Sequence, residues 1–399
     1  MTDKPERLEA LPLSQNSTGS GLIVTTLALL ALGVVMVHSA LAGVQAGWTV
    51  WYARADMRHA LFAVAATVVL CVGWRFKYRW LAGSSRWPTV AAMLLAAAIV
   101  CAVLVYVPGL GHRVNGKLRW LRFGPRQYGI GFQPSELLKL TLVMFMAAWL
   151  SRRWVDVRSL PKTVLPAATL MVGCLALVVT QDLGTAIMTG LAVLVTLFMA
   201  GVPWYWLACM AGAAGAGFWH FVADSPTRLA RIQAMINPWC QSNPSAYQPR
   251  QSLLAILTGG WTGKGLGSGI NKLGFVPEDS TDFIFAIFAE EWGLVGAILL
   301  MGLVVVWMWF VRRAAVRAGD RFGQLLAGSL GALIAMQMVL HIAVDLVAAP
   351  PTGVSFPFVS AGGTALVMMA GAVALIVSVS AHGRGDVAGE AGDRHAVTE

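Results

Sequence analysis

The chain has 399 residues, of which 57% are hydrophobic and only 12% are charged. With a mean hydropathy of +0.68, this composition excludes soluble globular and disordered proteins and indicates a protein that crosses a membrane many times. The formal net charge is +10, from 29 Lys and Arg against 19 Asp and Glu. The five cysteines contain no C-x-x-C pair, so they predict neither a disulfide framework nor a metal site.

Ten apolar stretches are long enough to cross a hydrocarbon layer of about 30 Å. The sequence therefore predicts an all-α, polytopic integral membrane protein with one membrane domain, 21–382, between an N-terminal tail, 1–20, and a C-terminal tail, 383–399. A large outward loop, 223–282, separates the seventh and eighth helices. The predicted spans are 21–43, 59–74, 87–107, 134–150, 164–180, 183–201, 203–222, 283–311, 324–348 and 361–381.

Short basic turns predict the orientation of these spans. The turns at 75–79, 152–153 and 312–317 lie in alternate loops, and loops rich in Lys and Arg face the cytoplasm. Both termini are then cytoplasmic. The first span ends in a sequence similar to a signal-peptidase site, but its apolar run is longer than usual for a signal peptide, so we expect an uncleaved anchor.

The outward loops also carry cations, and several of them lie close together in the sequence. They either contact water and lipid headgroups or form a site for an anionic substrate, and charge alone favours neither interpretation. A nucleic acid is a poor partner for an outward surface attached to so much lipid-facing chain. One such cluster, in the loop between the third and fourth predicted spans, comprises Arg113, Lys117, Arg119, Arg122 and Arg126.

The glycine-rich segment GGWTGKGLGSG (259–269) has a partial likeness to a phosphate-binding loop. A Walker A motif needs Gly at position 258 and Ser or Thr at position 265, where this chain has Thr258 and Gly265. We therefore expect a tight glycine turn that packs against helices.

The segment PEDSTDFIFAIFAEEWG (277–293) places carboxylates at the start of the eighth span. Thr281 is a candidate N-cap, and Asp282 would occupy the first helical turn, where the helix dipole stabilises a carboxylate. Asp282 could simply start the helix, but a functional role is the favoured interpretation. Glu290 lies two turns deeper, where a charge costs on the order of 3 kcal/mol unless it faces protein or water, so we expect it to be paired.

Other ionisable residues inside the spans are spaced for pairing along a helix. Glu136 and Lys139 are three residues apart, and His341 and Asp345 are four apart, so each pair shares a helix face. Asp182 interrupts the apolar run between the fifth and sixth spans. We expect these residues to orient helices.

Five motifs together resemble the successive signatures of the SEDS (shape, elongation, division, sporulation) family, which includes FtsW and RodA, over about residues 20 to 382. The resemblance implies a ten-helix glycosyltransferase of the bacterial cytoplasmic (inner) membrane that polymerises lipid II into peptidoglycan at the outer leaflet. It also implies a class B penicillin-binding protein and other divisome or elongasome membrane proteins as partners. The motifs are VNGKLRWLRFGPRQYGIGFQPSELLKL (114–140), QDLGTA (181–186), NPWCQSNPSAYQPRQSLLAILTGGWTGKGLG (237–267), PEDSTDFIFAIFAEEWGLVG (277–296) and PPTGVSFPFVSAGGTAL (350–366).

The family's essential acidic residue lies in a T-D-F-I-F motif, which falls on Asp282. Because diphosphate is a good leaving group, one general base with positive charge near the departing oxygens could be enough for an inverting transfer. Mg²⁺ or another divalent cation is a candidate cofactor, and no metal ligand is assigned. The candidate substrate-binding residues are Asn115, Lys117, Arg119, Arg228, Arg231, Gln248, Gln251, Lys264 and Glu278.

The chain departs from the family pattern at several positions, which indicates a divergent member. Ser280, Gln181 and Ala361 stand where the family commonly has His, Pro and Tyr. Two alternatives stay open. One is a flippase for lipid-linked peptidoglycan precursors, in which buried polar residues line a path across the bilayer. The other is a non-catalytic scaffold of a cell-wall synthesis complex.

Overall fold

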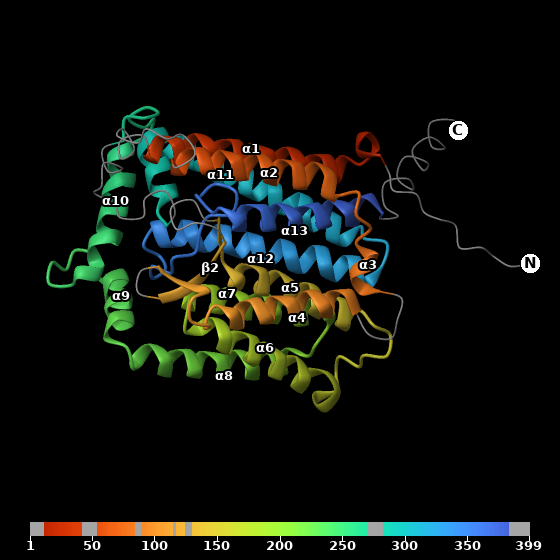
Figure 1. The fold of residues 1–399 in the computed structure, drawn as a ribbon. Coiled ribbons are helices and arrows are strands. Elements are labelled where there is room, and N and C mark those ends of the chain that lie inside the picture. Colours follow the sequence, from red (N-terminus) through yellow and green to blue (C-terminus); the bar gives the residue numbers. More distant parts are fainter. Residues whose placement is uncertain are drawn as a thin grey trace, which may run out of the picture.

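The structure, a computed structural model, describes residues 12–41, 54–83, 89–114, 117–123, 130–269 and 282–382. Long helices lie side by side in one bundle, and a small sheet and shorter helices cover one end of it (Figure 1). The predictions for Asn115, Glu278, Ser280 and Thr281 fall outside the described residues, as do those for the tail segments 1–11 and 383–399.

Ten helices in the described part of the chain correspond to the ten predicted spans. Eight of the helical segments are long and apolar enough to cross a membrane, and the shorter α4 and α5 pack against each other in the same bundle. The predicted polytopic helical fold is therefore confirmed. The helices are α1 (Ser17–Leu41), α2 (Ala55–Gly73), α4 (Thr89–Leu104), α5 (Pro134–Leu150), α6 (Leu165–Val179), α7 (Leu183–Ala200), α8 (Trp204–Ala223), α11 (Ile284–Val316), α12 (Arg321–Asp345) and α13 (Thr364–Ala381).

Shorter elements connect the bundle helices. The predicted outward loop contains two helices, α9 (Pro226–Ile236) and α10 (Tyr247–Gly259), which lie across one end of the bundle (Figure 1). We call this end the outer end. The remaining short elements are η1 (Leu13–Gln15), α3 (Arg79–Ala82), η3 (Leu160–Val164) and η4 (Pro244–Ala246).

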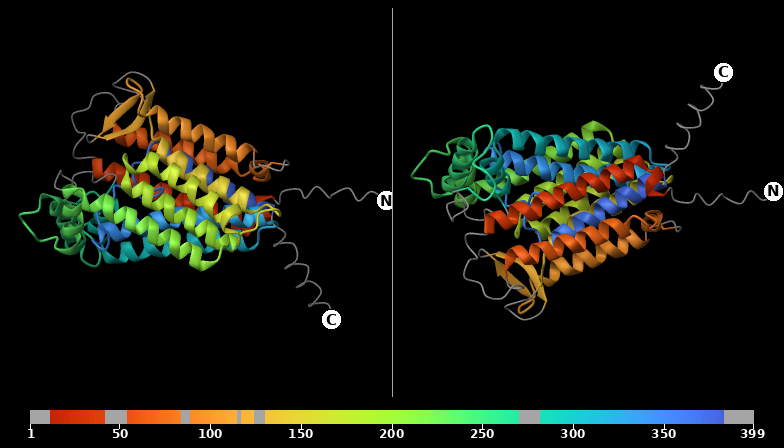
Figure 2. Two further views of the ribbon diagram at one scale, coloured as in Figure 1. Left: turned by 90° about the horizontal axis from the view of Figure 1, so that it is seen from below. Right: turned by 90° about the horizontal axis from the view of Figure 1, so that it is seen from above.

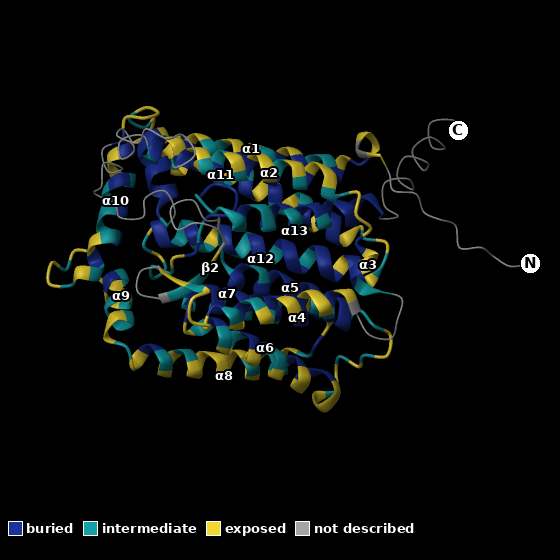
Figure 3. Ribbon diagram, viewed as in Figure 1, coloured by how far each residue is buried: buried dark blue, intermediate teal, exposed yellow. Residues whose placement is uncertain are grey.

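The helices differ widely in how far they are buried (Figure 3). Helices α5 and α12 lie in the middle of the bundle, and most of their residues are buried. Helix α8 lies along the edge, and Val222 is its one buried residue. The core therefore forms mainly around α5, α12 and the helices that pack on them.

A three-stranded antiparallel sheet is an addition to the helical fold that the sequence predicted. Its strands, β1 (Gly111–Val114), β2 (Lys117–Phe123) and β3 (Ile130–Phe132), follow that order in space. Leu121 of β2 pairs with Gly111 on one side and with Phe132 on the other. Figure 2 shows the sheet at the outer end, beyond α2 and α4. The helical period of the spans is lost here, because polar and apolar residues alternate along much of β2.

Helix α11 is broken at Gly293, whose φ of 69° and ψ of −169° are accessible mainly to glycine. The glycine turn that follows α10 binds the backbone groups that the break leaves free. Lys264 N donates to Glu290 O at 3.0 Å, and Leu294 N donates to Gly260 O at 2.9 Å. The predicted packing of this glycine turn against helices is confirmed, and it satisfies polar backbone groups in an apolar environment.

The loop between α12 and α13 enters the bundle. Phe356, Phe358 and Val359 of this loop are almost completely buried, and Phe358 has a φ of 69°, which is rare for a bulky residue. The absent side chain of Gly33 lets α1 approach the backbone of Phe358 and Val359 closely. The loop thus packs against α1 within the bundle.

Candidate active site

Asp282 lies at the outer end, just before α11, and its side chain is half-buried. The helix begins at Ile284, and the preceding residue, Phe283, makes no side-chain cap. The predicted place of Asp282 in the first helical turn is therefore wrong. The physical reason is that the cap comes from another helix, which allows the chain around Asp282 to stay non-helical.

That cap is Asp345, at the end of α12. Ala286 N, in the first turn of α11, donates to Asp345 Oδ2 at 2.9 Å. Ser252 Oγ of α10 donates to the backbone carbonyl oxygen of Asp345 at 2.7 Å. Asp345 has no exposed surface, and its charge is close enough to interact with that of Asp282. One buried residue therefore joins α10, α11 and α12 beneath Asp282.

His341 supports Asp345 from one turn earlier on α12. Its Nε2 lies 3.6 Å from Asp345 Oδ2, so the predicted pairing on one helix face is confirmed. Its Nδ1 donates to Val354 O at 2.9 Å, and its ring stacks on Phe356 at 5.1 Å between ring centroids. The imidazole thereby connects Asp345 with the loop that enters the bundle.

Residues 351–354 of that loop bring three further elements together. A Cβ atom on Gly353 would lie 3.5 Å from Asp282 Oδ2, and the φ of Gly353 is 70°. A Cβ atom on Gly184, in the first turn of α7, would lie 2.7 Å from Thr352 O. Arg231 of α9 donates from Nη1 to Pro351 O at 3.3 Å. The close approach of α7 to Thr352 requires a glycine at position 184, whereas Gly353 is favoured by its positive φ.

Arg119 and Asp182 form a charged pair next to this loop. Asp182 caps α7, accepting from Thr185 N at 3.3 Å, and its Oδ2 lies 3.9 Å from Arg119 Nη1. Asp182 is only two residues from Gly184, which packs on Thr352. Arg119, one of the candidate substrate-binding residues, is therefore held by β2 within the same group of elements as Asp282.

Two other predicted substrate-binding residues, Lys264 and Arg228, bind groups outside the loop that contacts Asp282. Lys264 donates to Glu290 Oε1 at 2.7 Å, which confirms the expected pairing of Glu290. Arg228 donates to Phe221 O at 2.8 Å and lies over the Phe221 ring, at the end of α8. Both cations thus have protein partners in this structure.

Helix α10 carries the two predicted glutamines. Both Gln248 and Gln251 are half-buried, and Gln248 shares a helix face with Ser252, which binds Asp345. The side chain of Lys117 is outside the described part. Among the candidates, Arg119, Arg231 and Gln248 are thus the ones whose neighbours connect them with the Asp282 region.

Sequence reasoning missed the roles of three residues in this region. The cap from Asp345 to α11 and the contact of Ser252 with Asp345 join segments about 59 and 93 residues apart. The close approach of Gly353 to Asp282 also depends on tertiary structure. One available signal was Asp345 itself, a carboxylate at the end of an apolar span, where a charge must find partners within the protein.

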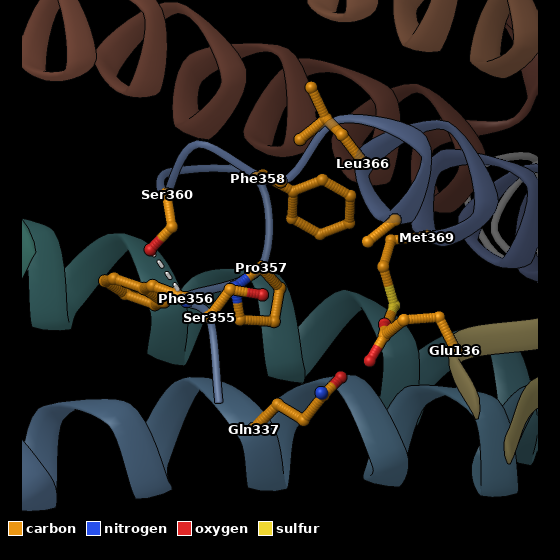
Figure 4. Close-up of a pocket in the computed structure, with 11 residues that line it drawn as sticks. Glu136, Gln337, Ser355, Phe356, Pro357, Phe358, Ser360, Leu366 and Met369 are labelled. Carbon is orange, nitrogen blue, oxygen red and sulfur yellow. Dashed lines mark hydrogen bonds between the residues drawn. The ribbon is translucent and has the colours of Figure 1, made fainter. Parts of the chain in front are cut away.

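The Glu136–Lys139 pair lies in α5, and its predicted formation is confirmed. Lys139 Nζ donates to Glu136 Oε1 at 2.7 Å, and Lys139 has no exposed surface. Glu136 also lines a small pocket with Gln337 and Ser355, beneath the loop that enters the bundle (Figure 4). In the described ranges, no three His, Cys, Asp or Glu side chains are placed to hold a metal ion. The divalent cation stays a prediction.

Comparison with known proteins identifies the family. The family model described as cell cycle protein, for FtsW, RodA and SpoVE, matches residues 20–385. The probable peptidoglycan glycosyltransferase FtsW of Nitrosococcus halophilus is 34% identical over 364 residues, which are 90% of this chain and 91% of that protein. Stage V sporulation protein E of Bacillus subtilis is 33% identical over 369 residues, 91% of this chain and 97% of that protein.

Solved structures have the same fold. The rod shape determining protein RodA of Thermus thermophilus matches with a TM-score of 0.63 and 25% identity, over 90% of this chain and 95% of that one. A chain from a structure titled for the coordination of polymerization and crosslinking by a peptidoglycan synthase complex matches with a TM-score of 0.73 and 24% identity, over 92% of this chain and 98% of that one. The chain therefore belongs to the FtsW, RodA and SpoVE family of polytopic membrane proteins, as its motifs predicted.

Proposed function

We propose that this protein is a peptidoglycan glycosyltransferase that polymerises lipid II at the outer leaflet of the bacterial cytoplasmic membrane, with Asp282 as the general base. The names of its relatives support the reaction class, since several are probable peptidoglycan glycosyltransferases at 32 to 34% identity. The identity of the base rests on the geometry around Asp282.

The observation that carries this proposal is the contrast between two neighbouring carboxylates. Asp345 is completely buried and bound to the backbone of α11, so it cannot reach a substrate. Asp282 is half-buried at the outer end and lies beside Gly353. Of the two, only Asp282 has the access to solvent that an acceptor hydroxyl requires.

The reaction transfers a sugar from a diphosphate to a hydroxyl group. Asp282 takes the proton from the acceptor hydroxyl, whose oxygen forms a bond to the anomeric carbon as the bond to the diphosphate oxygen breaks. This step inverts the anomeric centre and needs no covalent intermediate. Arg119 and Arg231 supply positive charge near the departing oxygens, and a divalent cation, if bound, would add to that charge.

The arrangement of the bundle supports the proposed orientation and partners. The first residues of α1 and the last of α13 lie at the same end, opposite α9 and α10 (Figure 1). Cytoplasmic termini would thus place Asp282 at the outer leaflet. The fold match to a chain of a peptidoglycan synthase complex is consistent with a class B penicillin-binding protein as partner, alongside other division or elongation proteins.

The test is lipid II polymerisation by the purified protein in nanodiscs. Each reaction is run with and without a class B penicillin-binding protein that lacks its transpeptidase serine, and with and without EDTA. We expect Asp282→Asn to lower the rate by at least about 100-fold, the usual scale of general base catalysis. The matched control is Asp224→Asn, because Asp224 is an exposed carboxylate on the same end of the bundle.

Each outcome has a clear meaning. Equal glycan strands from wild type and Asp282→Asn, with both proteins folded, would remove Asp282 from catalysis. No strands under any partner condition would instead favour the flippase or the scaffold, and precursor translocation across vesicles would separate these two.

A further inference from the structure

The small pocket that Glu136 and Gln337 share lies between α5, α12, α13 and the loop that enters the bundle (Figure 4). We call it the Gln337 pocket. Its volume is about 10 Å³, which is room for one water molecule and for no larger ligand. Three elements each contribute a polar side chain to its lining: Glu136 from α5, Gln337 from α12 and Ser355 from the loop. Phe358 and Met369 form apolar parts of the wall.

Gln337 has an unsatisfied side-chain oxygen in this pocket. Within the described part of the chain, Gln337 Oε1 has no hydrogen-bond partner, and the residue is only 2% exposed. Figure 4 shows the Gln337 amide and the Glu136 carboxylate pointing toward each other. A buried acceptor without a donor lowers the stability of a protein, so such atoms are nearly always hydrogen-bonded to protein or to ordered water. The pocket therefore requires a hydrogen-bond donor.

The charges around the pocket restrict the chemistry of that donor. Lys139 Nζ lies 2.7 Å from each oxygen of the Glu136 carboxylate, so the pair is neutral as a unit. A metal cation would meet the ammonium group of Lys139 at close range, and an anion would meet the carboxylate of Glu136. A neutral group with hydrogens to donate is the remaining choice, and the volume limits it to a water molecule.

The lining also provides enough partners for a water molecule. A buried water typically makes about three hydrogen bonds, whereas cavities that stay empty are lined by apolar groups. An ionised carboxylate has about four acceptor positions, so Glu136 can accept from a water as well as from Lys139. Gln337 Oε1 is a second acceptor, and the Ser355 hydroxyl can donate. The three partners come from three different elements.

We propose that the Gln337 pocket holds one ordered water molecule, which donates to Glu136 and to Gln337 Oε1 and accepts from the Ser355 hydroxyl. The water connects the ion pair of α5 with α12 and with the loop that carries Gly353 beside Asp282. It thereby supports this loop from inside the bundle. The proposal does not depend on the reaction that the protein catalyses.

Radiolytic footprinting detects the water directly, because hydroxyl radicals formed from a bound water oxidise the side chains beside it. The reporter is Met369, which lines the pocket and is 4% exposed. Its matched control is Met338, which follows Gln337 on α12, is 0% exposed and does not line the pocket. In full-length protein in nanodiscs, we expect Met369 to be oxidised several times faster than Met338. Gln337→Met and Ser355→Ala should each remove most of this difference.

A double-mutant cycle tests whether one water joins the two walls. Gln337→Met and Ser355→Ala each remove one of its hydrogen bonds, so together they should lower the midpoint of thermal unfolding less than the sum of the single changes. We expect a difference of about 1–2 °C, the scale of one net hydrogen bond in a chain of this length. The control cycle pairs Gln337→Met with Ser329→Ala, because Ser329 is a buried serine of α12 outside the pocket, about 12 Å away along the helix. These two changes should be additive.

Three results would overturn the proposal. Equal oxidation of Met369 and Met338 in the wild type would show that the pocket is dry. Fast oxidation of Met369 that persists in both Gln337→Met and Ser355→Ala would place the water on other partners. Additive effects of these two variants on thermal unfolding would mean that no shared molecule joins α12 to the loop. Neither measurement uses polymerisation, so the outcome does not affect the assignment of Asp282.

Discussion

Glu136 and Asp345 are both buried carboxylates, but they are stabilised in different ways. Glu136 is paired with Lys139 one turn later on the same helix, at 2.7 Å. Asp345 binds the backbone of α11 and is itself bound by Ser252 of α10. The first arrangement neutralises a charge within one helix. The second fixes the positions of three helices around Asp282, so it contributes to the site as well as to stability.

The largest expected effect comes from breaking the local pair. Lys139→Met leaves Glu136 buried without its cation, and an uncompensated buried charge typically costs about 3–5 kcal/mol. Thermal unfolding in detergent measures the loss. The control is the double variant Glu136→Gln/Lys139→Met, which removes both charges and should regain most of the stability. A single variant as stable as the wild type would show that the pair carries no such energy.

Removing the long-range cap should have a smaller effect on stability but a strong one on activity. Asp345→Ala removes the acceptor for Ala286 N, and we expect a loss of about 2 kcal/mol, the scale of a helix cap or a buried unsatisfied donor. Polymerisation should fall further than folding, because the start of α11 positions Asp282. Asp345→Asn keeps an oxygen for Ala286 N and should retain most of the stability. Equal losses of stability in both variants would contradict the capping role.

The smallest expected effect comes from Ser252→Ala. This change removes one hydrogen bond to Asp345 O and should cost about 1 kcal/mol. The comparison variant is Ser242→Ala, because Ser242 is exposed in the loop between α9 and α10. Chemical unfolding of the two variants should differ by this amount. No difference would mean that α10 is held to α12 by other contacts.

The features that the sequence predicted well are those that depend on neighbouring residues. The spans follow from continuous apolar runs, and the predicted fourth span has the same bounds as α5. The pairs Glu136–Lys139 and His341–Asp345 follow from helical spacing alone. The family motifs are also continuous stretches of sequence, and the fold that they implied is correct.

Other features depend on partners far away in the chain, and local patterns cannot reveal them. The start of α11 follows from Asp345, which is 59 residues beyond Ala286. The break at Gly293 is stabilised by the turn after α10, about 30 residues earlier. The sheet forms by strand pairing within the loop between the third and fourth predicted spans, for which no strands were predicted. The role of Asp282 as general base stays a prediction, because its position and its access to solvent do not establish that it takes a proton.

Gly33 of α1 contacts the loop between α12 and α13 that enters the bundle, and this contact affects the order in which the protein can fold during synthesis. Helix α1 leaves the ribosome before the other bundle helices, whereas the loop that contacts it is synthesised only after α12. The face of α1 that carries Gly33 therefore contacts lipid or other helices until α12 and α13 have entered the bilayer. Such a distant pairing delays completion of the core until the loop after α12 has been synthesised. A ribosome that stalls before α13 would release a chain whose first helix has no permanent neighbour at this position.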